Sequence, residues 1–347
     1  MSRRLACAHD RRTFLKMLAA VGGLGAVPLL EPCSSAAQSP TTQPSKVVGM
    51  RVGHVNPADH WMTELLKRWA DGVARRTGGG IKIDVHPGGV LGTGRTSAEG
   101  VAMGTIEAHF NDPSEYAFFN QALNILSAPF IWADRNQLQK AVRDPGILNT
   151  LYDSVIKKGI RPLALGYSGT RNVTTRNTPA KKPEDLKGLK IRVPEIPVYR
   201  DMVAAWGATP TPIPAAEIFT SLQAGVVDGQ ENPLAQIIAM RLYEVQKFVI
   251  LTRHITQTGS IIMNEKLFQD QPKEYQKALV DAAQEAMDWA FDYINAQDDK
   301  FLTQVKGFGV GVVEPDRQAF RDAMKPLYEK YDNIWTKELR EKIQSYR

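Results

Sequence analysis

The sequence predicts an α/β fold of two lobes, and three observations point to it. Predicted strands and helices alternate along the chain, which is typical of α/β units with mainly parallel sheets. A second series of the same kind begins after Gly166. An uninterrupted helix is then expected from Pro272 to about Val305. At 1.5 Å per residue it would be about 50 Å long, more than the width of one lobe, so we expect it to lie across both.

The first 37 residues are predicted to be an export signal and not part of the fold. The run Arg11–Lys16 begins with two arginines, and an apolar run follows from Met17 to Leu30. A basic stretch, a short apolar run and small residues near Ala37 are typical of a secretory signal, here similar to the twin-arginine type. The apolar run is shorter than the roughly 20 residues that span a bilayer. We therefore expect cleavage near Ala37 and a periplasmic protein.

The two cysteines, Cys7 and Cys33, both lie in this leader. A lipid anchor on Cys33 is the alternative to cleavage, but Glu31 and Pro32 stand where a lipobox has small residues. The exported chain then has no cysteine, which excludes disulfides, cysteine nucleophiles and thiolate metal sites from its chemistry. Its net charge falls from +6 to +3 without the leader. The basic residues are dispersed among acidic ones, which argues against nucleic-acid binding.

The elements of the first series follow a Pro-rich lead-in, residues 38–45, that we expect to be disordered. Asn56-Pro57 is expected to open the first helix, which ends at Gly78. The other expected elements are strands at Val47–Gly53, Ile81–Val85, Ile106–Phe110 and Ile160–Leu165, and helices at Ser97–Met103, Gln137–Val142 and Gly146–Lys157.

The second series is expected to form short strands and helices in the same alternation. A helix that begins at Pro214 should end at Gly225. The remaining elements are strands at Asn172–Thr175, Lys190–Val193, Val226–Gly229, Lys247–Leu251 and Ile255–Met263, and a helix over Val198–Trp206. Beyond the long helix, further helices are expected from Pro315 to the end of the chain.

Motifs of known enzymes are weak in this sequence. His54, Asp59 and His60 are close enough in sequence to bind a metal, to line a pocket or to be plain loop residues, and no third ligand follows at a recognisable spacing. The glycine-rich run Gly88–Arg95 lacks the ending of a phosphate loop and the spacing of a dinucleotide fingerprint. No Gly-x-Ser-x-Gly elbow occurs. We predict no catalytic residue, no metal and no cofactor.

Polar residues at strand ends between Tyr167 and Phe248 are better candidates for a binding site. Arg171 lies just before one predicted strand and Arg192 near the end of another, so both are placed to converge on a cleft. A guanidinium offers two coplanar donors that match a carboxylate and stays charged when desolvated. Asn232 stands beside a Pro-fixed turn and adds a neutral donor. For any one arginine, a solvated surface ion pair is the alternative.

Five motifs together resemble the substrate-binding proteins of tripartite ATP-independent periplasmic (TRAP) transporters, the dicarboxylate- and sialic-acid-binding family. They are Gly169–Arg171, Gly188–Pro194, Gly207–Pro212, Asp228–Leu234 and Tyr243–Phe248, of which Lys190–Pro194 and Asp228–Leu234 are the most specific parts. The resemblance covers nearly the whole chain after the leader. It implies a two-lobed binding protein with a central cleft and a long helix spanning both lobes. It also implies that Arg192 pairs with a ligand carboxylate, supported by Arg171 and Asn232.

The ligand class follows from residues where this chain departs from its relatives or adds polar groups. Glu195 stands where sialic-acid binders carry an asparagine, and Asp112 falls where the family places a polar contact. Acidic groups repel a second carboxylate and accept hydrogen bonds from hydroxyls. This favours a hydroxylated sugar acid, a uronate or aldonate, if Glu195 does not turn outward. Asn56 and His60 follow the first strand and are expected to face the same cleft.

The lobes are predicted to be discontinuous in sequence. Lobe I comprises residues 46–167 and 258–295, lobe II residues 168–257 and 296–314, and the helices of 315–347 pack across both. The expected partners are a small carboxylate and the membrane subunits of a TRAP transporter, with the protein itself a monomer or weak dimer. The same fold binding a C4-dicarboxylate, sialic acid or aromatic acid, or serving a sensor kinase, remains an alternative, and an exported hydrolase is a further one.

Overall fold

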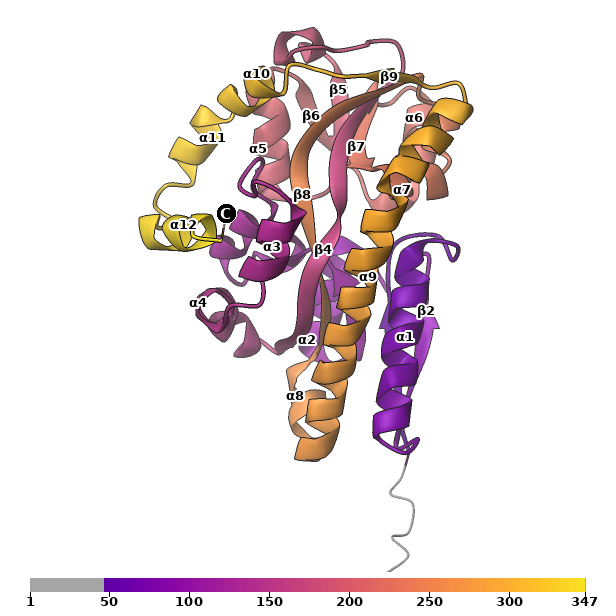
Figure 1. The fold of residues 1–347 in the computed structure, drawn as a ribbon, viewed down its shortest axis with the longest axis vertical. Coiled ribbons are helices and arrows are strands. Elements are labelled where there is room, and N and C mark those ends of the chain that lie inside the picture. The colour runs from indigo at the N-terminus through magenta and orange to yellow at the C-terminus, as the bar shows by residue number, and fades with distance from the viewer. Residues whose placement is uncertain (1–46, 347) are drawn as a thin grey trace, which may run out of the picture. The chain divides into compact units, whose positions relative to one another are not determined.

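The computed structural model describes residues 47–346 of the chain (Figure 1). The predicted export signal, its two cysteines and the lead-in of residues 38–45 lie outside the described residues. Within them, no helix is both long enough and apolar enough to cross a membrane.

The strands of the described residues form a single sheet in the order β2-β1-β3-β8-β4-β7-β5-β6, with β9 paired to β8. The strands are β1 (Val48–Gly53), β2 (Ile81–His86), β3 (Ala108–Asn111), β4 (Ile160–Thr175), β5 (Lys190–Val193), β6 (Thr209–Pro212), β7 (Gly229–Pro233), β8 (Phe248–Asn264) and β9 (Gly311–Val313).

The centre of this sheet differs from the prediction of separate short strands. Residues 160–175 form one continuous strand, β4, and residues 248–264 form another, β8. The two pair antiparallel along their length, with register shifts near Tyr167 and near Arg171. Parallel pairs, as predicted, occur on both sides of them, β1 with β2 and β3, and β5 with β6 and β7. The sheet is therefore mixed, and the two long strands join its two halves.

The helices alternate with the strands as the sequence predicts. The α-helices are α1 (Trp61–Arg76), α2 (Gly94–Met103), α3 (Arg135–Ala141), α4 (Pro145–Ile156), α5 (Pro197–Ala205), α6 (Ile218–Gln223), α7 (Leu234–Ala239), α8 (Glu265–Gln269), α9 (Lys273–Gly307), α10 (Arg317–Asp322), α11 (Lys325–Lys330) and α12 (Lys337–Gln344). Short 3₁₀ helices are η1 (Pro113–Tyr116), η2 (Gln121–Ser127), η3 (Pro183–Leu186), η4 (Ala215–Glu217) and η5 (Leu242–Glu244).

The long helix predicted for residues 272–305 is confirmed as α9, with 35 residues. In Figure 1 it runs beside β4 and α1. Its small buried face permits close packing: a Cβ added at Gly72 of α1 would lie 2.9 Å from the Cβ of Ala282. The indole Nε1 of Trp69 donates to the carbonyl oxygen of Leu279 at 3.1 Å, which joins α1 to α9.

The start of α1 corrects the prediction that Asn56-Pro57 opens this helix. The first helical residue is Trp61, and His60 is the N-cap, whose Nδ1 accepts from the backbone amide of Met62 at 3.3 Å. Pro57 instead belongs to a turn, because its carbonyl oxygen accepts from the amide of His60. The side chain of His60 therefore caps the N-terminus of α1.

The helices after residue 315 contact elements far apart in the sheet. Lys330 of α11 pairs with Asp201 of α5 at 2.7 Å, and the hydroxyl of Tyr328 donates to the carbonyl oxygen of Pro129 at 2.9 Å. The Nε2 of Gln137 in α3 donates to the carbonyl oxygen of Ile343. The packing of these helices across the two lobes stays a prediction, as do the residue boundaries of the lobes.

Candidate functional site

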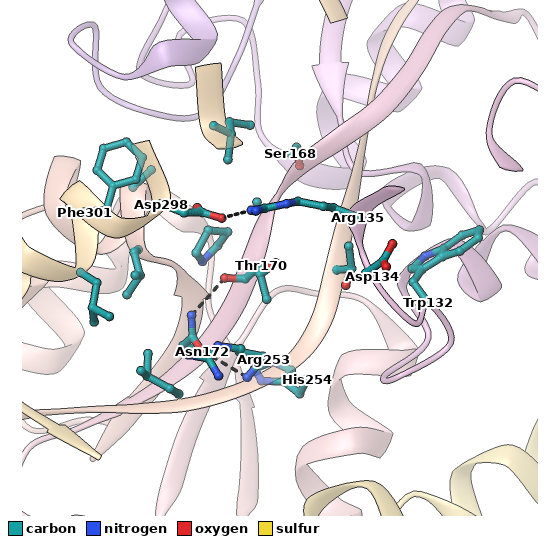
Figure 2. Close-up of a pocket in the computed structure, with 18 of the residues that line it drawn as sticks. Trp132, Asp134, Arg135, Ser168, Thr170, Asn172, Arg253, His254, Asp298 and Phe301 are labelled. Carbon is teal, nitrogen blue, oxygen red and sulfur yellow. Dashed lines mark hydrogen bonds and ion pairs between the residues drawn. The ribbon is translucent and has the colours of Figure 1, made fainter. Parts of the chain in front are cut away.

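Seven residues were predicted for the site, and none of them lines the large cavity of about 420 Å³ that β4, β8, α9 and α10 border (Figure 2). A smaller cavity, of about 60 Å³, lies on the sheet where β4, β7 and β5 are neighbours. Five of the seven line it: Asn56, Asp112, Arg171, Arg192 and Asn232. We call this smaller cavity the cleft.

Three neighbouring strands carry the residues of the quoted motifs to the cleft. Arg171 lies on β4, Asn232 on β7 and Arg192 on β5. β7 pairs antiparallel with β4 and parallel with β5, so Arg192 is in register with Gln230, two residues before Asn232. Residues some 60 positions apart in the chain thus meet on one short stretch of sheet.

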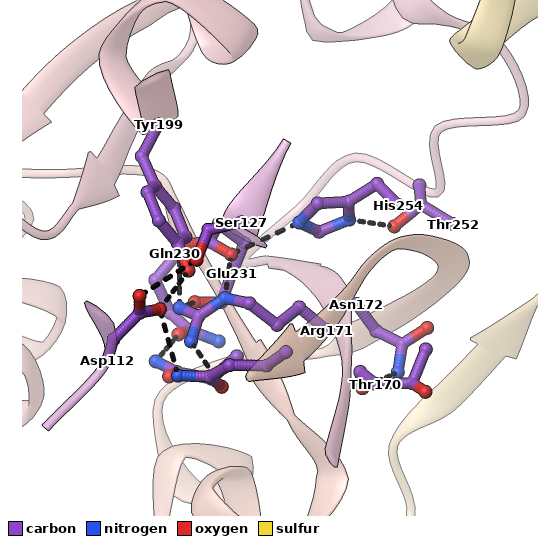
Figure 3. Close-up of polar contacts among 12 residues, drawn as sticks. Asp112, Ser127, Thr170, Arg171, Asn172, Tyr199, Gln230, Glu231, Thr252 and His254 are labelled. Carbon is purple, nitrogen blue, oxygen red and sulfur yellow. Dashed lines mark hydrogen bonds and ion pairs between the residues drawn. The ribbon is translucent and has the colours of Figure 1, made fainter. Parts of the chain in front are cut away.

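Each of the three guanidinium nitrogens of Arg171 donates to a protein group (Figure 3). Its Nε and Nη2 pair with the two carboxylate oxygens of Glu231, and Nη2 also donates to the Glu231 carbonyl oxygen at 2.6 Å. Nη1 donates to Oε1 of Gln257 at 3.0 Å. The ring of Tyr199 lies 5.0 Å from the guanidinium carbon. This buried, bidentate pairing positions Arg171 and neutralises its charge.

Glu231 is held in its charged form from two sides. Burial raises its pKa, but Arg171 and the His254 ring outweigh this and hold the pKa of Glu231 below its usual range. His254 Nε2 contacts Glu231 Oε2 at 3.1 Å, and Thr252 Oγ1 contacts His254 Nδ1 at 2.7 Å. Burial lowers the pKa of His254. A neutral ring that donates from Nε2 and accepts at Nδ1 satisfies both contacts.

Arg192 has a different environment, although both arginines are only 3% exposed. Its Nε donates to the carbonyl oxygen of Ile213 at 2.8 Å. Within residues 47–346 its two terminal amino groups make no hydrogen bond or ion pair, and the residue lines the cleft. Burial is the largest effect and lowers the pKa of Arg192 to about 10. Attraction from Glu231 opposes this shift, and repulsion from Arg171 adds to it. A buried guanidinium with free donors is a strong site for an anion.

The two asparagines contribute amide groups whose hydrogen bonds are partly used. Asn232 Nδ2 donates to Oε1 of Gln230 at 2.5 Å. Asn56 Oδ1 accepts from Nε2 of Gln236 at 3.2 Å, and its Nδ2 lies 2.9 Å from the sulfur of Met62. An amide nitrogen carries two donors, so each side chain retains hydrogen-bonding capacity toward the cleft.

Asp112 lines the cleft, but protein donors already occupy its carboxylate. Oδ1 accepts from the amide of Ser114 at 2.9 Å and from Ser127 Oγ at 2.8 Å. Oδ2 accepts from the Tyr199 hydroxyl at 2.8 Å and from Gln257 Nε2 at 3.5 Å. Burial is the largest effect and raises the pKa of Asp112 despite these donors. A carboxylate has about four acceptor positions, so Asp112 mainly joins protein groups to each other.

The structure does not bring Glu195 and His60 into the cleft. Glu195 is exposed and lines an adjoining hollow that it shares with Arg192 and Pro194, so its side chain lies at the outer edge. His60 is buried at the start of α1, where its Nε2 has no partner within the described residues. Burial lowers the pKa of His60 to about 3, so the ring is neutral. The described residues contain no group of three or more side chains suited to a metal ion.

Several residues in or beside the cleft escaped the sequence analysis. Glu231 pairs with Arg171 but does not line the cleft; it stood inside a quoted motif, where an acidic side chain next to Asn232 was a usable signal. Tyr199 and Gln257 gave none, because nothing local distinguishes them from other helix or strand residues. Glu115 faces the cleft and accepts a hydrogen bond from Asn111 Nδ2. Burial, and then repulsion from Asp112, raise the pKa of Glu115 to about 8.

Comparison with known proteins adds three findings. The family described as bacterial extracellular solute-binding protein, family 7, matches residues 52–334. The chain is 34% identical over 259 residues to the 2,3-diketo-L-gulonate-binding periplasmic protein of Escherichia coli K12, covering 74% of this chain and 79% of that protein. Its fold matches a TRAP periplasmic solute-binding protein from Roseobacter denitrificans with bound β-D-glucuronate, with a TM-score of 0.82 and 28% identity, over 86% of this chain and 99% of that chain.

A second solved structure gives the same result. It is the TRAP periplasmic solute-binding protein from Ochrobacterium anthropi with bound L-fuconate, matched with a TM-score of 0.81 and 28% identity. The match covers 86% of this chain and 99% of that one. The two-lobed α/β fold predicted from the sequence is confirmed by these likenesses.

Proposed function

The chain belongs to family 7 of the bacterial extracellular solute-binding proteins, and from this premise we propose that its cleft captures a hydroxylated monocarboxylic acid. Uronates and aldonates are the favoured class. The bound acid is delivered to a TRAP-type secondary transporter, whose membrane subunits supply the energy from an ion gradient. The protein performs no chemistry on the acid, needs no cofactor and acts in the periplasm after export by the twin-arginine-type leader and cleavage near Ala37.

The observation that carries this proposal is the contrast between the two arginines of the cleft. Glu231 satisfies the guanidinium of Arg171, whereas the terminal amino groups of Arg192 have no acceptor within the described residues. A ligand carboxylate placed against Arg192 supplies that acceptor. Asn232 and Arg171 then act as the supporting residues, the first by a spare amide donor and the second by fixing Glu231 and Tyr199 around the site.

The opposite wall argues for hydroxyls on the rest of the ligand. Asp112 and Glu115 both line the cleft, so a second carboxylate there meets two acidic side chains. Glu115 is largely protonated near neutral pH because of its raised pKa, and a neutral carboxyl both donates to and accepts from a hydroxyl. Asn56 can add a further donor. Glu195, at the outer edge, contacts only a ligand that extends out of the cleft.

The relatives support a sugar acid by what they bind. The names of the three compared proteins specify 2,3-diketo-L-gulonate, β-D-glucuronate and L-fuconate, each a carboxylic acid with several oxygen substituents. These ligands share one carboxylate and a polar remainder, which is the pattern that the unpaired Arg192 and the acidic wall favour.

Binding requires the two halves to separate and close. Arg171 and Arg192 are both buried, so a solute cannot reach Arg192 without an opening movement. The hydrogen bonds that join the predicted lobes at the cleft include Tyr199 to Asp112 and Gln236 to Asn56. Hinge motion about the long strands is the common mechanism for such closure, and the closed form presents a distinct surface to the membrane partner.

A thermal-melt screen against carboxylic acids tests the proposal. The panel contains uronates, aldonates, sialic acid, C4-dicarboxylates, 2-oxo acids and aromatic acids, with neutral sugars as matched controls. An acid at 100 times its Kd stabilises the folded protein by about 2.7 kcal/mol, which raises the Tm by several degrees at most. Shifts with uronates or aldonates alone support the proposal. Shifts with dicarboxylates or aromatic acids alone reject the ligand class, and equal shifts with neutral sugars reject the carboxylate itself.

A further inference from the structure

The large cavity bordered by β4, β8, α9 and α10 is separate from the cleft and has no role in the proposed transport function. It holds about 420 Å³ between the two long strands and α9 (Figure 2). Ligand pockets usually have 300–1,000 Å³. Its walls combine apolar side chains with charged ones, and the apolar part includes Trp132, Phe301 and Leu302.

One end of this cavity carries a concentration of positive charge. Arg253 of β8 and Arg317 and Arg321 of α10 all line it. Arg253 pairs with Glu314 at 3.5 Å. Within residues 47–346 neither Arg317 nor Arg321 forms an ion pair with a carboxylate. Burial, and then repulsion from Arg253 and Arg321, lower the pKa of Arg317.

The acidic groups of the cavity lie elsewhere on its wall. Asp298 of α9 pairs with Arg135 of α3, as the dashed line in Figure 2 shows, and Asp299 and Asp134 are exposed at the rim. The opposite charges of Asp298 and Arg135 cancel. The cation excess is therefore confined to the end formed by β8 and α10.

A buried hydroxyl provides an independent sign that the cavity accepts a polar group. Ser168 of β4 is 3% exposed, lines the cavity and has no hydrogen-bond partner for its Oγ within the described residues. A buried hydroxyl without a partner costs free energy, on the order of 1–3 kcal/mol. A ligand atom that exchanges a hydrogen bond with Ser168 removes that cost.

We propose that this cavity is a second binding site, for an organic anion with an apolar or aromatic body. The anionic group lies against Arg317 and Arg321, which lack carboxylate partners. The body lies along Trp132, Phe301 and Leu302, where apolar contact displaces water. Arginine guanidinium groups bind anionic groups that present two or more acceptor oxygens, as carboxylates and sulfonates do.

Titration with the dye 8-anilino-1-naphthalenesulfonate tests this site, since the dye combines an aromatic body with one anionic group. The purified protein should bind one dye molecule, with saturable fluorescence. The double variant Arg317→Gln/Arg321→Gln should raise the dye Kd at least tenfold. Both residues are exposed on α10, so the variant should keep the fold, which the unchanged Tm verifies. Arg75→Gln, an exposed arginine of α1, is the matched control and should leave the Kd unchanged.

A cleft variant separates this proposal from the transport function. Arg192→Ala should leave the dye Kd unchanged, since Arg192 does not line the large cavity. The proposal is overturned if the dye does not bind saturably, if the double variant binds it like the unaltered protein, or if Arg192→Ala weakens it. The last result would place the dye in the cleft.

Discussion

Replacing each cleft arginine by methionine, in separate variants, should give opposite effects on stability and on ligand binding. Methionine keeps much of the length and apolar volume of the side chain but removes the charge. Arg171 and Arg192 have the same 3% exposure, so burial alone predicts equal effects. The difference lies in their partners: Arg171 is paired with Glu231, and the terminal amino groups of Arg192 are unpaired.

The magnitudes follow from these contacts. Removing Arg171 leaves the buried carboxylate of Glu231 without its main partner, and breaking a buried pair in this way costs about 3–5 kcal/mol of stability. Arg192 has a pKa of about 10 where 12.5 is ordinary, so keeping its charge buried costs on the order of 3 kcal/mol. Arg192→Met should therefore leave the ligand-free protein as stable as before, or more stable.

Ligand affinity should show the reverse contrast. A carboxylate bound to the free amino groups of Arg192 makes a buried, charge-assisted pair, and truncating one partner of such a pair costs about 2–5 kcal/mol. This corresponds to a Kd that rises by about 30-fold to 4,000-fold. Urea unfolding without ligand and calorimetric titration with the acid found by screening measure the two quantities. The reasoning is refuted if Arg192→Met destabilises the protein as much as Arg171→Met does, or if it binds the acid with unchanged affinity.

Three further changes test the opposite wall and the packing behind it. Because its pKa is about 8, Glu115 binds more protons in the folded than in the unfolded chain between about pH 4.5 and 8. The free energy of unfolding should therefore fall as the pH rises through that range. Urea unfolding curves measured at stepped pH should show a smaller fall for Glu115→Gln. Tyr199→Phe removes the donor to the Asp112 carboxylate and should weaken ligand binding about tenfold to 100-fold by calorimetry, a loss of about 1.5–3 kcal/mol. Gly259→Ala places a Cβ 2.3 Å from Cζ of Phe110 and should destabilise the protein by about 1–3 kcal/mol in urea unfolding.

Matched controls accompany these variants. Tyr275→Phe removes a hydroxyl bonded to the Thr77 carbonyl oxygen, far from the cleft in sequence and fold, and should not change affinity. Gly49→Ala adds a Cβ with nothing within 4 Å and should change stability by less than about 0.5 kcal/mol. A pH profile equally steep in Glu115→Gln, full affinity in Tyr199→Phe, or unaltered stability in Gly259→Ala would each contradict the corresponding geometry.

Local sequence patterns predicted a helix or strand correctly where the residues of that segment carry the deciding signal. The helix α9 is recognisable because 35 residues lack any internal glycine or proline and place alanines on one face. The strand β5 was predicted with its observed bounds, Lys190–Val193, because glycine and proline flank it. In these segments the local pattern alone is enough to predict the element and its ends.

Other elements depend on contacts that no local pattern contains. Prolines at positions 210 and 212 argue against a strand, yet β6 forms because it lies at the edge of the sheet, where a missing amide donor is tolerated. The segments 160–165 and 172–175 looked like separate strands because Gly166 and Gly169 interrupt them. Pairing with β8 carries β4 through both glycines, with shifts in register at that point.

The same distinction explains the candidate site. Arg171, Arg192 and Asn232 lie in motifs at strand ends, so their placement beside one another was foreseeable from the sequence. Which arginine keeps free donors was not, since that depends on Glu231 reaching Arg171 across β4 and β7. His60 was placed in the cleft because it follows the first predicted strand. The helix begins at Trp61 and not at Pro57, and this shift gives the imidazole a capping role.

The proposed closure of the two halves draws on the protein's own contacts across the cleft and on the ligand. The hydrogen bond from Gln236 to Asn56 joins neutral groups and contributes about 0.5–1.5 kcal/mol net, whereas the one from Tyr199 to the carboxylate of Asp112 contributes about 1.5–3 kcal/mol. A carboxylate on Arg192 adds about 2–5 kcal/mol, available only when the site is dry. A ligand without that group binds the open and closed forms with similar affinity, and so cannot shift the protein toward the form that the transporter recognises.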